Sequence, residues 1–222
     1  MAVRQSPHSE GAATPRSPDA IDSRAQYDSA AQAKRVIERE HRSLAAVLHG
    51  LLYSLREIRY LHGDPDFVLL NAMLEYVDSF LERLHHPKED QYLFERLRAR
   101  CAGAQPLLDR LHGEHVSGAV KLRDLRQALD RYQARGRDAF PEFARLAADY
   151  AAFHWSHMST EESEVLPLAT RHLTSQDWMV IDDAFQGHSD PLLGDERRDE
   201  QQSLFRRIVS LAPPPLGIRV RE

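Results

Sequence analysis

Four long segments of the chain repeat apolar residues at steps of three and four, and three short clusters containing Gly with Pro or Asp separate them. The clusters are Gly63-Asp64-Pro65, Gly103-Ala104-Gln105-Pro106 and Gly136-Arg137-Asp138. Such a repeat puts side chains on one face of an α-helix, and clusters of this kind end helices. Because turns this short make neighbouring helices antiparallel, the sequence predicts an all-α protein, an up-down-up-down four-helix bundle that starts near Asp28.

The parts of the chain outside these segments have a different composition. Residues 1–27 are rich in Ser, Pro, Ala and Gly with scarcely any apolar periodicity, so they cannot offset the entropy lost on ordering. A short fifth helix is expected over about Ser175–Gln186, after the candidate cap Thr174. We therefore expect a flexible N-terminal tail (1–27), a bundle with a short extra C-terminal helix (28–192) and a peripheral C-terminal segment (193–222).

The composition is typical of a soluble protein. Hydrophobic residues make up 42% and charged residues 28% of the 222 residues, and no stretch approaches the roughly 18–20 apolar residues of a membrane-spanning helix. Because the start of the chain has no apolar signal segment and Cys101 is the single cysteine, we expect a cytoplasmic protein. The net charge of −5 is spread along the chain, which argues against a nucleic-acid partner. With 12 His against 1 Cys, a metal site would use imidazole and carboxylate ligands.

Histidine and glutamate interrupt the apolar stripe of every long segment. The second and fourth segments each carry a His-x-x-x-Glu pair, whose members lie about 6 Å apart on one helix face, and the first and third segments each add one His. A stripe residue faces the interior of a bundle, so these side chains should point at the bundle axis. The candidate metal ligands are His41, His85, Glu89, His115, His157 and Glu161.

The six candidates should also lie at one level of the bundle. About 20 residues separate His41 from the first turn and about 20 separate that turn from His85, and the same holds for His115 and His157 across the third turn. Four imidazoles and two carboxylates are enough for two ions about 3.5–4 Å apart, each with two His and with the carboxylates shared. Such ligands suit iron, with manganese and zinc as alternatives.

The motifs around these residues resemble a known family. They are Glu40-His41-Arg42-Ser43-Leu44, His85-His86-Pro87-Lys88-Glu89, Glu114-His115, and residues 154–162 followed by Leu166-Pro167. Together they resemble the hemerythrin-like, HHE cation-binding domains, over about residues 30–192, including Asp190-Pro191-Leu192. The resemblance implies an oxo- or hydroxo-bridged di-iron site that meets dioxygen or related small molecules.

Two departures from oxygen-carrying hemerythrins bear on function. Those proteins have a second His four residues before or after the third-helix ligand, where this chain has Leu111 and Ala119. Their fourth-helix carboxylate lies five residues after its His, whereas this chain offers Glu161 at four and Glu162 at five. The chain is therefore more similar to the four-His, two-Glu subclass, which includes bacterial di-iron proteins proposed to repair iron centres after nitrosative or oxidative damage. This likeness argues against a simple reversible oxygen carrier.

Several alternatives stay open at this stage. Each histidine taken alone could be an ordinary core or surface residue, and His86 is not assigned a role. His112 and His154 lie three residues before ligands, so either could be a fifth ligand or a hydrogen-bond partner of the site. Pro87 should kink the second helix and aim its ligands. A ferritin-like site would need Glu-x-x-His on two helices, and only residues 38–41 fit that pattern.

Two functional hypotheses follow. The first is a non-haem di-iron protein that binds, senses or processes dioxygen, peroxide or nitric oxide, with a link to iron handling or to the repair of iron centres under stress. The second is an interaction or regulatory module without turnover, in which metal occupancy sets the stability of the bundle.

Overall fold

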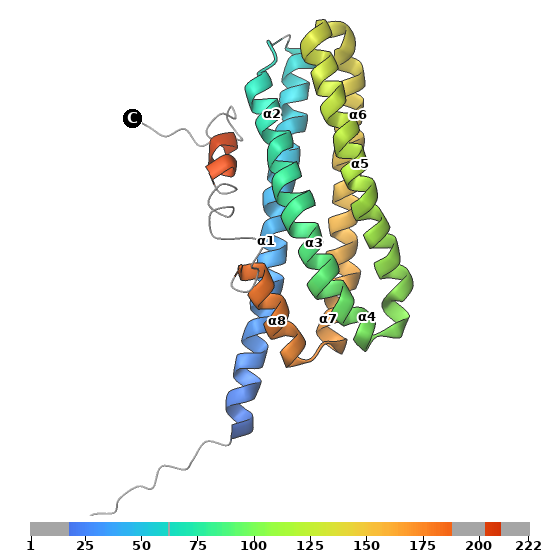
Figure 1. Ribbon diagram of the computed structural model, residues 1–222. Helices are drawn as coiled ribbons and strands as arrows, with labels where there is room; N and C mark the ends of the chain where they lie inside the picture. Colours follow the sequence, from blue (N-terminus) through green and yellow to red (C-terminus); the bar gives the residue numbers. More distant parts are fainter. Residues whose placement is uncertain (1–17, 62, 188–202, 210–222) are drawn as a thin grey trace, which may run out of the picture.

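A computed structural model describes residues 18–61, 63–187 and 203–209, and side chains from residue 29 onward. Within these residues all regular secondary structure is helical, and four rods stand side by side in a long bundle (Figure 1). The first rod is α1 (Pro18–Tyr60), the third is α5 (Gln105–Arg135), and the fourth joins α6 (Phe140–Thr160), η5 (Glu161–Val165) and α7 (Leu166–His172). The second rod joins α2 (Phe67–Tyr76), η1 (Val77–His85), α3 (His86–Lys88), η2 (Glu89–Phe94) and α4 (Glu95–Arg100). The predicted four-helix bundle is thus confirmed.

The rods end where the sequence predicts breaks. Asp66 accepts a hydrogen bond of 2.9 Å from the backbone N–H of Leu69 and so caps α2 after the first turn. The one-turn helices η3 (Ala102–Ala104) and η4 (Gly136–Ala139) form the second and third turns, and Gly136 supplies the positive φ of 70° that ends α5. The predicted fifth helix is α8 (Ser175–Gln186), which starts at a capping box formed by Thr174 and Asp177.

The first rod begins earlier than the sequence predicts. Helix α1 starts at Pro18, ten residues before Asp28, and its N-terminal end projects beyond the other rods (Figure 1). Proline is favoured at the start of a helix, and neither Gly nor Pro interrupts residues 19–60, apart from Gly50. The absence of apolar periodicity before Asp28 therefore indicates where α1 stops packing against the other rods, and not where the helix begins. The flexibility predicted for residues 1–17 lies outside the described residues.

The C-terminal region contributes an unpredicted contact. Residues 203–209 are helical, and Ile208 is only 3% exposed within the main core cluster. The ring of Phe205 lies 5.6 Å from that of Tyr76 on α2. The rest of the segment predicted as peripheral, and the Asp190-Pro191-Leu192 motif, lie outside the described residues.

The apolar core is divided into two clusters. One lies toward the first and third turns and includes Leu48, Met73, Leu125 and Phe143. The other lies toward the opposite end, where α8 packs against α1, and includes Ile37, Phe94, Leu108, Val165 and Phe185. On each rod, buried histidines or glutamates stand between the two clusters. The bundle therefore has one buried polar layer, enclosed at both ends by apolar side chains.

Wide helical turns accompany this layer on the second and fourth rods. The segments η1, η2 and η5 are π-helical, with the N–H of His86, Glu95 and Leu166 each donating to the carbonyl five residues earlier. Pro87 lies between two of these segments and has no N–H to donate. Wide turns of this kind are frequent at functional sites, because they change the direction in which side chains project.

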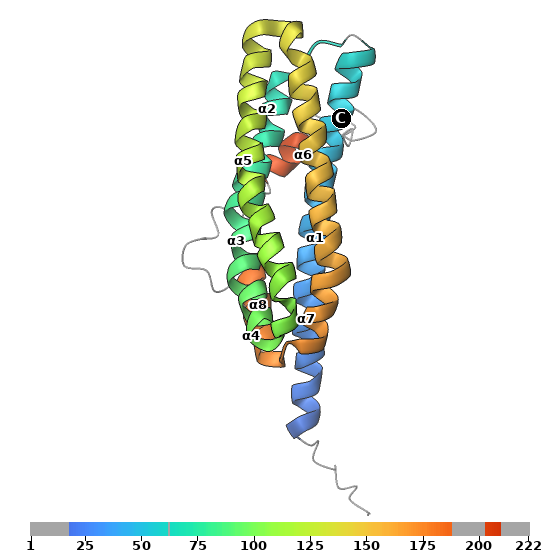
Figure 2. The same ribbon diagram turned by 90° about the vertical axis from the view of Figure 1, so that its right-hand side faces the viewer.

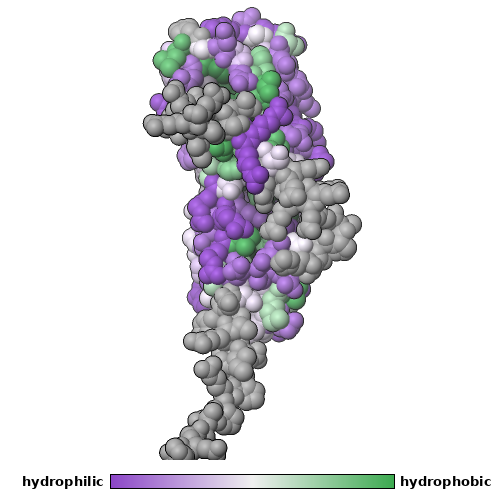
Figure 3. All heavy atoms as spheres, turned by 90° about the vertical axis from the view of Figure 1, so that its left-hand side faces the viewer, coloured by the Kyte–Doolittle hydropathy of each residue, from purple (hydrophilic) through white to green (hydrophobic). Residues whose placement is uncertain are grey.

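One face of the bundle is shown in Figure 3 by the hydropathy of its residues. On the face that Figure 3 shows, the atoms not drawn in grey are mostly hydrophilic with small apolar areas between them. No helix among the described residues is long and apolar enough to cross a membrane. The bundle viewed from the opposite side shows α5 and α6 packed along each other over most of their length (Figure 2).

Candidate metal centre

The polar layer contains all six side chains that the sequence proposed as metal ligands. Each is buried, with exposed fractions between 0% and 5%. The first rod supplies His41, the second His85 and Glu89, the third His115 and the fourth His157 and Glu161. The structure thus brings the six together at one level, while their role as ligands stays a prediction.

The four imidazoles form two pairs. The Nε2 atoms of His41 and His85 lie 3.1 Å apart, and those of His115 and His157 lie 3.0 Å apart. Two ligand atoms that bind one ion at about 2.1 Å and at right angles are about 3.0 Å apart. Each pair is therefore spaced as two neighbouring ligands of one cation.

Two carboxylates lie between the imidazole pairs. Glu89 places Oε1 3.2 Å from Nε2 of His85 and Oε2 3.6 Å from Nε2 of His115. Glu161 places Oε1 3.2 Å from Nε2 of His157 and Oε2 3.4 Å from Nε2 of His41. Each carboxylate thus turns one oxygen toward each pair, which is the arrangement of a ligand that bridges two ions.

The buried oxygens of these carboxylates point to the same conclusion. Among the described residues, no side chain or backbone group forms a hydrogen bond with either oxygen of Glu89 or Glu161. Buried polar atoms without partners are rare and costly, and bound cations are one of the ways to satisfy them. The donor set therefore fits a pair of cations.

A second set of carboxylates holds the outer nitrogen of each imidazole. The distances from Nδ1 to the nearest carboxylate oxygen are 2.9 Å for His41 with Glu162, 2.8 Å for His85 with Glu40, 3.1 Å for His115 with Asp90, and 2.8 Å for His157 with Glu114. Three of these contacts are hydrogen bonds, whereas Asp90 lies within ion-pair distance of His115 without hydrogen-bond geometry. A carboxylate on Nδ1 favours the tautomer with the proton there, so that Nε2 presents a lone pair to a metal.

The sequence contains a signal for this outer set of carboxylates. Each of the four carboxylates is the immediate neighbour of a proposed ligand: Glu40 and Glu114 precede a ligand histidine, while Asp90 and Glu162 follow a ligand glutamate. Each then reaches a histidine on another rod. Neighbours in sequence project about 100° apart around a helix, so adjacency alone made them resemble an ordinary charged face.

When no cation is bound, the carboxylates favour the charged form of the imidazoles. Burial lowers the pKa of His41, but the carboxylates of Glu162 and Glu89 outweigh it and raise the pKa to about 9. Burial likewise lowers the pKa of His115, and Asp90 with other carboxylates raises it to about 9. The pKa values of the other two imidazoles, His85 and His157, are also raised. Metal ions and protons therefore compete for the same nitrogens.

The three histidines left open by the sequence take different positions. His112 is exposed and lies 3.0 Å from Asp90, on the outer side of His115. His154 is fully buried, with its ring 6.2 Å from that of His157 and outside the groups of side chains able to share a cation. His86, which the sequence left without a role, is buried beside His115.

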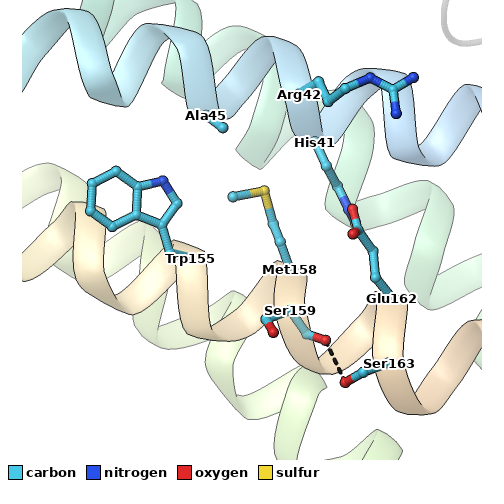
Figure 4. Close-up of a pocket in the computed structure, with 8 residues that line it drawn as sticks. All are labelled: His41, Arg42, Ala45, Trp155, Met158, Ser159, Glu162 and Ser163. Carbon is cyan, nitrogen blue, oxygen red and sulfur yellow. Dashed lines mark hydrogen bonds and ion pairs between the residues drawn. The ribbon is translucent and has the colours of Figure 1, made fainter.

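A groove of about 480 Å³ leads from the surface to the His41 side of the centre. It lies between α1 and the fourth rod and is lined by His41, Trp155, Met158 and Glu162, among others (Figure 4). In this view His41 and Glu162 point toward each other, and Met158 points from its helix toward α1. A small molecule in the groove would therefore lie close to His41, one member of the first imidazole pair.

A bundle whose interior gathers four imidazoles and two carboxylates that lie between them defines a helical cation-binding protein. Comparison with protein families identifies which kind: the chain matches the hemerythrin HHE cation binding domain over residues 33–169, more than half of its length. The chain therefore belongs to the hemerythrin HHE cation-binding family, and the resemblance of its motifs is confirmed. No curated protein matches the chain.

Proposed function

We propose that the protein is a non-haem di-iron protein that binds, senses or processes dioxygen, peroxide or nitric oxide. In this proposal one iron is held by His41 and His85 and the other by His115 and His157, with Glu89 and Glu161 shared and an oxo or hydroxo bridge between the irons. The observation that carries the proposal is the spacing of the imidazoles, whose Nε2 atoms lie 3.1 Å apart in one pair and 3.0 Å apart in the other. Each buried carboxylate turns one of its oxygens toward one pair and the other oxygen toward the second pair. Imidazole with carboxylate is a ligand set that suits iron, and manganese or zinc could occupy the same atoms.

Two bound irons would supply electrons and open coordination positions to a small ligand. The protein contributes the directions of the imidazoles, which the outer carboxylates favour, and an interior enclosed by the two apolar clusters. The groove beside His41 has apolar walls from Ala45, Trp155 and Met158, which suits a small uncharged molecule. Iron donation to damaged centres, in the cytoplasm under stress, is the wider role that we propose for such a site.

The second hypothesis, a metal-dependent regulatory module, has one observation in its favour. All four rods contribute charged groups to a buried layer, so cation occupancy should affect the stability of the whole bundle. This hypothesis predicts that metal protects the chain from proteolysis without any reaction with dioxygen, peroxide or nitric oxide.

The proposal can be tested by loading the purified protein anaerobically with ferrous ions. We expect about two irons per chain, and absorption changes on exposure to air, peroxide or nitric oxide. The variants His85→Ala and His157→Ala should lose metal, whereas His172→Ala, which changes an exposed histidine on α7, should not. Two bound irons that react with none of the three molecules would favour the regulatory hypothesis.

A further inference from the structure

His86 shares the features that distinguish the four proposed imidazole ligands. It is only 2% exposed, and its Nδ1 lies 3.3 Å from a carboxylate oxygen of Glu82. Its Nε2 is buried and has no hydrogen-bond partner among the described residues. An imidazole with a carboxylate on Nδ1 and a free, buried Nε2 is prepared to bind a metal.

The position of His86 relates it to the second imidazole pair. One ring nitrogen of His86 lies within 4.8 Å of ligand atoms of Glu89, His115 and His157. Its ring is stacked on that of His115, with the ring centres 4.0 Å apart and an angle of 14° between the planes. Two ligands of one ion are at most about 4.2 Å apart when each bond is about 2.1 Å, so small side-chain movements suffice for His86 to join this set.

An internal repeat shows what is special about this position. Glu-His occurs at 40–41 and again at 114–115, and His-x-x-x-Glu followed by an acidic residue occurs at 85–90 and again at 157–162. The outer carboxylates follow the repeat, because Glu40 and Glu114 hold the equivalent histidines, as do Asp90 and Glu162. In this repeat His86 corresponds to Met158. The two halves of the centre are therefore chemically different at this position.

The residue at the equivalent position lines the groove. Met158 borders the groove together with His41, on the side of the first imidazole pair (Figure 4). A thioether is a soft ligand that suits copper more than iron in an oxygen and nitrogen site. The first pair thus has no counterpart of His86 among the described residues that line the groove, and its member His41 borders that groove.

We propose that His86 is a fifth imidazole ligand, bound to the ion that His115 and His157 hold. The ion at His41 and His85 then keeps the open position and takes the small ligand that enters through the groove. This inference rests on the proposed di-iron function and adds to it a difference between the two ions. This fifth imidazole comes from the second rod, where His86 directly follows His85. In oxygen-carrying hemerythrins, by contrast, the additional histidine is on the third helix.

His154 provides a matched control. It is as deeply buried as His86, and the two ring centres are 5.9 Å apart. Neither of its ring nitrogens has a hydrogen-bond partner among the described residues, and no carboxylate holds it. Loss of a buried imidazole in general should affect both positions, whereas loss of a ligand should be specific to His86.

The test counts the imidazoles that bind cobalt(II), which replaces iron and shifts the NMR signals of its ligands. Each ligand imidazole with its proton on Nδ1 gives one strongly shifted, exchangeable signal. We expect five such signals in the wild-type protein and in His154→Gln, and four in His86→Gln. One of the two cobalt equivalents should also bind at least about tenfold more weakly in His86→Gln, judged from the effects of outer-shell changes at metal sites.

The outcomes separate this inference from the proposed function. Four signals in wild-type protein that binds two cobalt ions would overturn the role of His86 and leave the di-metal site intact. If His86→Gln gives as many shifted signals as the wild-type protein, the role of His86 as a ligand is likewise overturned. Wild-type protein that binds neither cobalt nor iron would overturn the proposed function and this inference together. If His86→Gln does not fold, the number of shifted signals in the wild-type protein and in His154→Gln still tests the inference: five in both supports it, and four in the wild-type protein overturns it.

Discussion

Stability of the protein without metal should fall as the pH rises from 7 to 9. The folded state raises the pKa of His41 and His115 to about 9, while an unfolded chain has the ordinary value of about 6.5. A histidine whose folded pKa is raised contributes its full stabilisation below pH 6.5 and loses it as the pH passes through 9. For His41, which is only 3% exposed, the difference corresponds to about 3 kcal/mol.

Other groups of the buried layer do not reverse this trend. His115 contributes a loss of similar size, but it shares Glu89 and Glu161 with His41, so the two effects should not add fully. Burial raises the pKa of Glu82 to about 7, which adds to the loss near neutral pH. We therefore expect a total loss of about 3–6 kcal/mol by pH 9.5.

The assay is urea unfolding of protein treated with a chelator, followed by circular dichroism between pH 6.5 and 9.5. Protein loaded with cobalt is the comparison, because metal binding already requires neutral imidazoles and should remove the loss. The variant Glu162→Gln removes the carboxylate on Nδ1 of His41, so its stability should depend less steeply on pH. A stability that is constant or rises between pH 7 and 9 without metal would refute this reasoning.

Three further predictions concern metal affinity and packing. The raised pKa values of His41 and His115 favour their protonated forms at pH 7, so binding of two ions should release at least two protons per chain. Calorimetry in buffers of different ionisation enthalpy measures this number, and binding without proton release would contradict the prediction. Glu114→Gln should weaken cobalt binding about 10–100-fold in a chelator competition, whereas Glu75→Gln, at the surface, should not; equal affinities would count against the outer carboxylates. Gly118→Ala should be about 1–3 kcal/mol less stable than Gly113→Ala in urea unfolding. A Cβ added at residue 118 lies 3.3 Å from a carboxylate oxygen of Glu82, whereas one added at residue 113 meets nothing within 4 Å. Equal urea midpoints for the two variants would contradict this packing.

Most of the fold could be predicted because local signals and burial agree. The glycine and proline clusters end the rods, and the repeats of three and four face the two apolar clusters. The start of α1 at Pro18 could not be predicted from periodicity, because that part of the helix projects beyond the other rods and needs no apolar stripe. The packing of Ile208 was missed because it depends on a distant partner surface and not on its own segment.

The inner side chains of the site could be predicted and the outer ones could not. His41 and His115 stand in apolar stripes, so periodicity and the distance to a turn together indicate one level. The carboxylates that hold them, Glu162 and Asp90, belong to other rods and are partly exposed, and a single helix cannot show which histidine they reach. His86 lies about 100° from His85 on an ideal helix, and only the observed course of the π-helical second rod places it inside.

The most direct test of the account is the amount of iron that the purified protein binds when it is offered ferrous ions without oxygen. We expect two irons per chain in the wild-type protein and a marked loss in His85→Ala and His157→Ala, with the helical content retained. A protein that stays without metal under these conditions, or variants that keep both irons, would contradict the assignment of this buried layer as a di-metal centre.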